Sequence, residues 1–318
     1  MTDRTGLDTV MLSVLESLDE MGARPDQPMV KSARVVDHCY ATRGIPPRVG
    51  YDAVCVAAAP WLTHVRVIDF HGNFGSADPN DDPAAARYTE IRQARSGAMA
   101  FESERGELPR LPIGLINGDL AMGGSAPPFD PARVVEALRA VSSDTATDAE
   151  LVEILGPPAF PTRCPVTADL DAIAAGTRTL LRVSSDITIE NGDHGTRLLI
   201  SRVPYGVGSD DVANAIANRV DAVRSGRLRA AYPDLENALD LPLRDLRNES
   251  TGDTTRVVCD LLAGSNAELC RDRLLETWPL TIEFPVQLRA PLPTLVRGFV
   301  DDPAVQNEAL AVLLLVID

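Results

Sequence analysis

The sequence has few aromatic residues, a single lysine and no long hydrophobic run. Aromatic residues make up 4% of the 318 positions, so the core has to be built from aliphatic side chains. The longest apolar stretch, residues 309–317, is about half of what spans a bilayer, which indicates that no segment crosses a membrane. Residues 1–20 contain no basic region leading an apolar run, so we expect no secretory signal and a cytoplasmic protein.

The cysteines are also few, and their spacing excludes common metal motifs. The chain has five cysteines, with no CxxC pair among them: Cys39, Cys55, Cys164, Cys259 and Cys270. An odd, scattered set of this kind is typical of buried thiols in a reducing compartment. We therefore predict neither disulfides nor a zinc site, and no metal ligands on this chain.

The charge is strongly acidic but unevenly spread. The formal net charge is −16, which argues against a protein whose whole surface grips nucleic acid or an anionic membrane. Residues 31–66 are the exception, with five basic and two acidic residues. This basic island coincides with two short predicted helices separated by a break at residues 44–47. Two helices around such a break are typical of a helix-turn-helix.

The order of predicted elements indicates an α+β protein. The first half reads as mostly helical, with helices over residues 7–21, 31–43, 51–59, 84–100, 131–141 and 147–155, and a loop region over residues 60–83. From residue 178 the pattern becomes β-rich, with strands at 180–183, 187–189, 198–203 and 256–262 and helices after Ser209 and Asn266. Helices first and a mixed region later predict at least two subdomains.

Three strings stand in order along the first hundred residues. They are KSARVV at residues 31–36, GNFGS at 72–76 and AAARYTEIR at 84–92. Together they resemble the breakage–reunion domain of the A subunit of bacterial type IIA topoisomerases, that is, DNA gyrase and topoisomerase IV. Weaker similarities continue toward the C-terminus, among them VPYGV at 203–207 and RNES at 247–250.

The resemblance implies a domain plan. We expect a winged-helix (helix-turn-helix) DNA-gate domain over residues 1–130, followed by a tower-like α/β domain over residues 131–290. Residues 291–318 would be the remnant of a truncated coiled-coil gate. The family dimerises through its DNA gate, so a homodimer is expected.

Within the family, the tyrosine of RYTE is the nucleophile that cleaves DNA, and it corresponds to Tyr88. A phenolate that attacks phosphorus stores the energy of the phosphodiester in a phosphotyrosine, so the break can be resealed. Positive charge nearby favours the phenolate, and Arg87 is the neighbour that would supply it and clamp the phosphate. Arg34 completes the predicted catalytic set.

Further residues are predicted to hold the DNA. Lys31 lies where a recognition helix would grip a phosphate, and Arg43 and Arg48 carry the remaining charge of the basic island. Asn73 belongs to a glycine-rich loop that lets the backbone approach a DNA strand. Leu120 corresponds to the apolar wedge with which the family enters a base step and bends the duplex.

Two functional interpretations stay open. In the first, the chain is a subunit of an ATP-hydrolysing type II DNA topoisomerase, inactive alone, that binds double-stranded DNA and works with a gyrase B-type partner. No ATP-binding motif is visible, so Mg²⁺ and ATP are expected only on that partner. In the second, the chain is a catalytically degenerate binding protein, a decoy, regulator or immunity factor for a resident topoisomerase. The family's two histidines near residue 45 are absent here, which favours the second, whereas the retained GNFGS and ARYTE favour the first.

Overall fold

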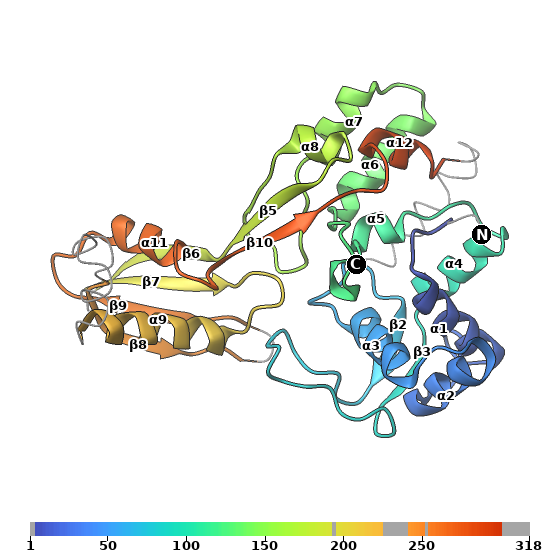
Figure 1. Ribbon diagram of the computed structural model, residues 1–318, viewed down its shortest axis with the longest axis horizontal. Coiled ribbons are helices and arrows are strands. Elements are labelled where there is room, and N and C mark those ends of the chain that lie inside the picture. The colour runs from blue at the N-terminus through green and yellow to red at the C-terminus, as the bar shows by residue number, and fades with distance from the viewer. Residues whose placement is uncertain (1–3, 193–194, 225–240, 252–253, 301–318) are drawn as a thin grey trace.

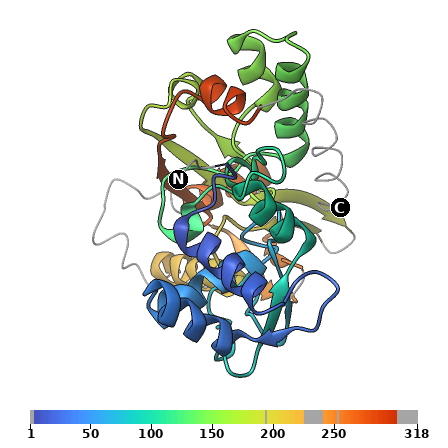
Figure 2. The ribbon, with the colours of Figure 1, turned by 90° about the vertical axis from the view of Figure 1, so that its right-hand side faces the viewer.

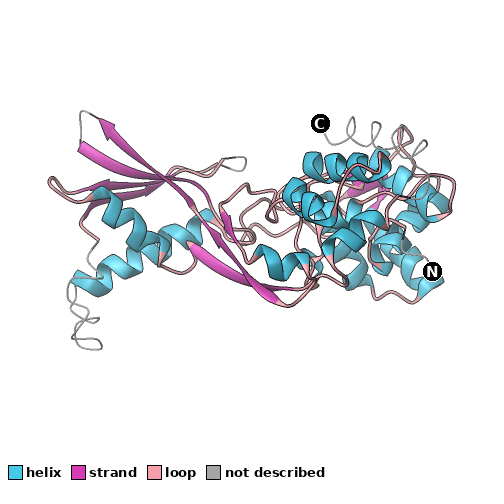
Figure 3. Cartoon of the chain, turned by 90° about the horizontal axis from the view of Figure 1, so that it is seen from above, coloured by secondary structure: helices cyan, strands magenta, loops and turns pink. Residues whose placement is uncertain are grey.

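The computed structural model describes residues 4–192, 195–224, 241–251 and 254–300. It shows an elongated mixed α+β molecule with a helical part at one end and a sheet-and-helix part at the other (Figures 1 and 3). The two ends are joined by two antiparallel strands that run along the long axis.

The N-terminal part begins with three helices that pack on one another: α1 (Thr9–Glu20), α2 (Ser32–Arg43) and α3 (Pro47–Ala58). The Asp8 side chain caps α1 by accepting from the first free backbone N–H groups of that helix. Gly44, at φ 70°, ends α2, and Pro47 starts α3 at the position where a missing N–H costs nothing. The two helices predicted around residues 44–47 are thus present.

A small antiparallel sheet closes this part. Its strand order is β1 (Val30–Lys31), β3 (Glu90–Gln93) and β2 (Ile68–His71). Helix α4 (Arg95–Glu104) follows β3 directly and packs on α1. Figure 2 shows the N-terminal helices in blue at the bottom of the view and the helices that follow α4 in green at the top.

A second group of helices lies at the same end of the molecule as the N-terminal part, on its other side (Figures 1 and 2). It contains α5 (Ile113–Asn117), the short 3-10 helix η1 (Leu120–Met122), α6 (Pro131–Ser142), α7 (Asp148–Leu155), α8 (Leu170–Ala174) and α12 (Leu292–Arg297). Thr147 and Glu150 form the capping box of α7 that the sequence predicts. Beside these helices lies the sheet β10 (Thr281–Val286), β5 (Thr179–Ser184) and β4 (Val166–Thr167).

The far end is a four-stranded antiparallel sheet with two helices. Its order is β6 (Asp186–Gly192), β7 (Gly195–Arg202), β9 (Val257–Leu261) and β8 (Leu243–Asn248), with α9 (Ser209–Arg224) and α11 (Ala267–Leu275) packed against it. This end has its own buried cluster, which includes Leu198, Val212 and Leu274. A second, larger cluster of buried side chains fills the rest of the molecule and includes residues from both ends of the described chain, Met11 and Phe299 among them.

One predicted helix is wrong. Residues 84–89 form a loop and residues 90–93 a strand, and only residues 95–104 are helical. The backbone of this segment is used elsewhere, because β3 pairs with both β1 and β2. Residues 60–83, expected to be loop throughout, contain β2. The division at residue 130 and the gate remnant stay predictions, since most of residues 291–318 lie outside the described residues.

Candidate functional site

The loop that carries Tyr88 covers the start of helix α2. The carbonyl of Ala86 accepts from the N–H of Ala33 at 3.1 Å, and the carbonyl of Thr89 accepts from the N–H of Ser32 at 3.0 Å. Helix α2 has no side-chain cap of its own. Two free donors of its first turn are therefore satisfied by the loop, which fixes Tyr88 beside the helix.

A buried hydroxyl chain ties the same loop to α3. The Thr89 hydroxyl has no exposed surface and donates to Ser32 Oγ at 2.8 Å. Tyr51 of α3 donates to the carbonyl of Ala84 at 2.5 Å, and its Oη lies 3.1 Å from Thr89 Oγ1. Burial raises the pKa of Tyr51, so its hydroxyl keeps the proton that this hydrogen bond needs.

The glycine-rich loop lies directly against the loop of Tyr88. Gly72 has φ +109°, and a Cβ there would sit 3.3 Å from the Thr89 side chain. Asn73 accepts from the N–H of Ala84 through its carbonyl at 3.0 Å and from the N–H of Gly75 through its side chain at 2.7 Å. The exposed Asn73 therefore shapes the turn with its amide oxygen.

Tyr88 itself points away from the core. It is 63% exposed, and the Arg87 guanidinium carbon lies 4.5 Å from the centre of its ring. A cation over the face of a phenol is attracted to it, and here it also places a phosphate-binding group over the tyrosine ring. The structure thus brings together two of the three predicted catalytic residues.

Lys31 has an acidic partner that the sequence did not reveal. In the small sheet, Lys31 and His71 flank Glu90 on the two neighbouring strands. Lys31 Nζ lies 2.9 Å from one Glu90 oxygen, and His71 Nδ1 lies 3.8 Å from the other. The hydrogen bond and charge of Lys31 hold the pKa of Glu90 below its usual value. Cross-strand register, which local sequence does not encode, makes this pair.

The three arginines of α2 and α3 that the sequence singles out are placed differently. Arg34, on the first turn of α2, is exposed and makes no ion pair within the described residues. Arg48 is 94% exposed at its side chain, and its Nε lies 3.9 Å from Asp52. Arg43 is 16% exposed and reaches the carboxylates of Glu16 and Glu20 at 2.9 and 3.0 Å. Both carboxylates belong to α1, so the charge of Arg43 is compensated where α2 packs on α1 and is not available to a phosphate.

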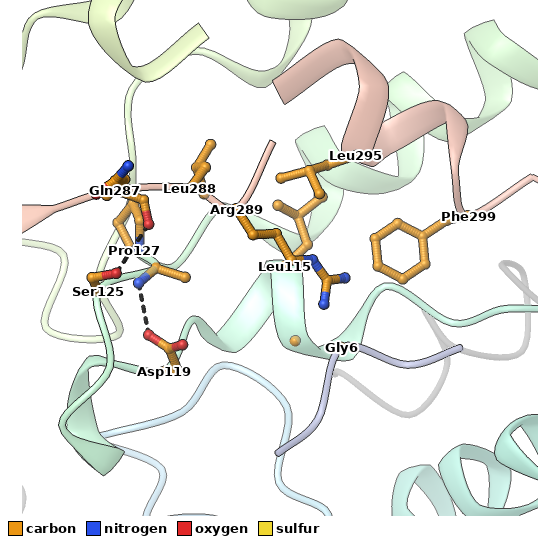
Figure 4. Close-up of a pocket in the computed structure, with 12 residues that line it drawn as sticks. Gly6, Leu115, Asp119, Ser125, Pro127, Gln287, Leu288, Arg289, Leu295 and Phe299 are labelled. Carbon is orange, nitrogen blue, oxygen red and sulfur yellow. Dashed lines mark hydrogen bonds between the residues drawn. The ribbon is translucent and has the colours of Figure 1, made fainter. Parts of the chain in front are cut away.

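Leu120 lies on η1 and packs against the larger core cluster (Figure 4 shows the neighbouring pocket). The turn that follows is closed by Asp119, whose carboxylate accepts from the N–H of Ala126 at 2.6 Å. Asp119 and Ser125 line a pocket of about 280 Å³ together with Leu295 and Phe299 of the C-terminal region. The half-buried position of Leu120 leaves its role as a wedge a prediction.

Within the described ranges, no group of three or more His, Cys, Asp or Glu side chains is arranged to hold a metal ion. Nor does the described part contain a helix with the length and apolar character needed to cross a bilayer. The five cysteines are free thiols, four of them buried.

Comparison with known proteins places the chain in a family. A family model for the A subunit of DNA gyrase and topoisomerase IV matches residues 4–290. The chain is 29% identical over 313 residues to the DNA gyrase A subunit of Thermotoga maritima, covering 90% of this chain and 37% of that protein. It is 30% identical over 312 residues to that of Kosmotoga olearia, covering 88% and 36%. It is 29% identical over 323 residues to the DNA topoisomerase 4 A subunit of Synechocystis, covering 89% and 33%.

The chain therefore belongs to the family of DNA gyrase and topoisomerase IV A subunits, as the motifs at residues 31–36, 72–76 and 84–92 predict. It spans about a third of the length of the curated relatives it matches.

Proposed function

We propose that this chain binds double-stranded DNA and cleaves and reseals it transiently through a Tyr88 phosphotyrosine, as a subunit that works with a gyrase B-type partner. The observation that carries the proposal is the exposed Tyr88 side chain with the Arg87 guanidinium over its ring, on a loop that three elements hold in place. A nucleophile for a polymer has to be both accessible and fixed, and Tyr88 is both.

The chemistry is a reversible transesterification. Tyr88 Oη forms a bond to phosphorus while one P–O bond to a sugar of the backbone breaks, and the sugar oxygen takes up a proton as the phenol loses one. Arg87 binds the non-bridging oxygens and offsets their charge, and exposed Arg34 and Arg48 with Lys31 hold flanking phosphates. Reversal by the sugar hydroxyl reseals the strand with no other energy source.

The family also implies Mg²⁺, and the residues around Tyr88 do not fit it. The nearest acidic side chain along the strand, Glu90, is already engaged by Lys31 and His71. A hard cation of this kind needs several free carboxylate or carbonyl oxygens. We therefore assign Mg²⁺ and ATP to the B-type partner. A winged-helix arrangement of α2 and α3 with the small sheet, and a homodimer, belong to the same proposal.

A second candidate function is a binding protein of the same family that does not cleave. This function is favoured because two basic side chains expected to bind DNA are paired with carboxylates of the same chain. Arg43 is paired with two glutamates, and Lys31 is paired with Glu90. Those two residues were expected to grip phosphates, and their pairing weakens the grip of a chain whose net charge is −16.

Trapping covalent DNA separates the two functions. The full chain is incubated with supercoiled plasmid, a gyrase B subunit and Mg²⁺ or Ca²⁺, then quenched with detergent, and protein-linked linear or nicked DNA is measured. The proposal expects a product that Tyr88→Phe abolishes and that Tyr40→Phe, another exposed tyrosine, leaves unchanged. A folded wild-type protein that binds the plasmid and forms no covalent product would leave only the second function.

A further inference from the structure

A pocket with four arginines in its lining is separate from the site of Tyr88, which is not one of its lining residues. It has a volume of about 480 Å³ and lies between the connection from α3 to β2, the start of α4 and the segment around residue 163. Its basic lining residues are Arg66, Arg92, Arg95 and Arg163, with His64 beside them, and we call it the arginine pocket. Three separate segments of the chain contribute these side chains.

The charges of the arginine pocket are not balanced within the described part of the chain. Asp69 lies 3.1 Å from Arg92 and compensates that residue alone. Arg66, Arg95 and Arg163 are exposed, and none makes an ion pair with a carboxylate among the described residues. The remaining acidic lining residue is Asp26, so positive charge is in excess here in a protein of net charge −16.

Such an excess is unfavourable unless something offsets it. Guanidinium groups around one concave space repel one another, and low-dielectric walls focus their field into the space. A chain with 46 acidic residues has many carboxylates available, yet the fold leaves these three arginines without one among the residues described. A bound anion is the simplest source of the missing charge, and the planar fork of arginine matches phosphate oxygens.

His64 does not add to this charge at neutral pH. Its Nε2 lies 2.8 Å from the carbonyl of Ala159, and the ring is mostly enclosed. Burial lowers the pKa of His64, and the nearby Arg163 lowers it further. His64 thus forms part of the wall, and the arginines supply the attraction.

We propose that the arginine pocket binds a phosphate group, supplied either by a DNA backbone that extends past Tyr88 or by a free nucleotide. That the pocket binds phosphate follows from its own residues. That the phosphate comes from DNA rests on the proposed function. Strand β2 connects the two places, with His71 at the end near Tyr88 and Arg66 before the other end. Five residues of extended chain cover roughly 17 Å, the length of about five base pairs of duplex.

The test compares two sets of three charge-removing substitutions in the full chain. The first, Arg66→Gln with Arg95→Gln and Arg163→Gln, empties the pocket of its uncompensated charge. The second, Arg139→Gln with Arg178→Gln and Arg182→Gln, removes the same charge from exposed positions outside the pocket. Binding of a labelled 30-base-pair duplex is measured by anisotropy over a range of salt, and binding of inorganic pyrophosphate by calorimetry.

If DNA is the source, the pocket variant binds the duplex more weakly. The slope of log affinity against log salt then falls by up to about three, roughly one for each phosphate that the variant no longer binds. The control variant keeps the wild-type slope to within one. Restoring charge with lysine at the same three positions recovers most of the affinity, which a merely unfolded variant would not do.

If a nucleotide is the source, the wild type binds pyrophosphate, the pocket variant does not, and the duplex slope is the same for both. Should the wild type fail to bind duplex at all, the proposed function falls, and the pyrophosphate measurement still decides the pocket. Equal behaviour of the pocket and control variants toward both probes would overturn the inference.

Discussion

The hydroxyl of Thr89 is the point at which the loop of Tyr88 can be loosened with the smallest change. Thr89 has no exposed surface, and its hydroxyl joins Ser32 of α2 to Tyr51 of α3. Thr89→Val keeps the shape of the side chain and removes only this hydrogen-bonding group. Ser32, also fully buried, then loses the donor that it has in the native protein.

The expected loss can be built from these hydrogen bonds. A typical buried hydrogen bond contributes about 1 kcal/mol net, and a buried hydroxyl left without a partner costs about 1–3 kcal/mol. We therefore expect Thr89→Val to lower the free energy of unfolding by about 2 kcal/mol. Tyr51→Phe removes the donor to the carbonyl of Ala84, a residue that is only partly buried, so about 1 kcal/mol is expected there.

Because Thr89 and Tyr51 are in contact, their effects should not add. The double variant is expected to be more stable than the sum of the two single losses implies, by about 0.5–1 kcal/mol. Urea unfolding followed by circular dichroism measures all four proteins of the cycle. Thr188→Val on β6, an exposed threonine without a side-chain hydrogen bond among the described residues, is the control and should change stability by less than about 0.5 kcal/mol.

The reasoning is refuted if Thr89→Val unfolds at the wild-type urea concentration, since the buried chain of hydroxyls would then contribute nothing. If the proposed function holds, Thr89→Val should also change the cleavage reaction. A looser loop should slow formation of the covalent product while leaving duplex affinity unchanged, because Thr89 is buried and cannot touch DNA.

Three further predictions concern the glycine-rich loop, the core and a thiol. Gly75→Ala should destabilise by about 2 kcal/mol in urea, since φ is +85° and the new Cβ would sit 2.6 Å from a backbone oxygen, whereas Gly123→Ala, at φ +80° with open space around it, should cost about half as much. Phe160→Ala should cost about 3–5 kcal/mol by the same assay, because the ring is 1% exposed and packs against two other aromatic rings; a loss below about 1 kcal/mol would contradict this packing. Burial raises the pKa of Cys259 from 9.0 to about 12, so the folded state favours the neutral thiol, and this stabilisation is complete below pH 9 and is lost as the pH rises toward 12. Unfolding at pH 8 and pH 10 should therefore show a smaller alkaline loss in Cys259→Ala than in the wild type, by about 1 kcal/mol, and equal losses would rule the effect out.

Much of the local structure follows from residue patterns. The helices α2 and α3 with their break at Gly44, and the capping box of α7, are where the sequence predicts them. The segment at residues 84–94, predicted as a helix, shows the limit of such pattern-based prediction. Its alanines, arginines and glutamate favour a helix, but its backbone groups pair with β1, β2 and the start of α2, and those partners lie far away in the sequence.

The candidate site also has residues that the sequence identifies and residues that only the fold reveals. Short motifs with fixed spacing identify the family and single out Tyr88 and Arg87, because neighbours in sequence stay neighbours in space. Tyr51 and Thr89 carry no signal of their own, and their joint role appears only when α2, α3 and the loop meet.

The α+β class, the family and the position of the RYTE tyrosine can all be read from the sequence. Which charges are available depends instead on how the chain packs. The fold pairs Arg43 with two glutamates of α1, leaves Arg34 exposed, and gathers Arg66, Arg95 and Arg163 from three segments into one pocket. The physical reason is that a charge is free or compensated according to what lies within a few ångströms of it, and for these residues those neighbours are tens of residues away along the chain.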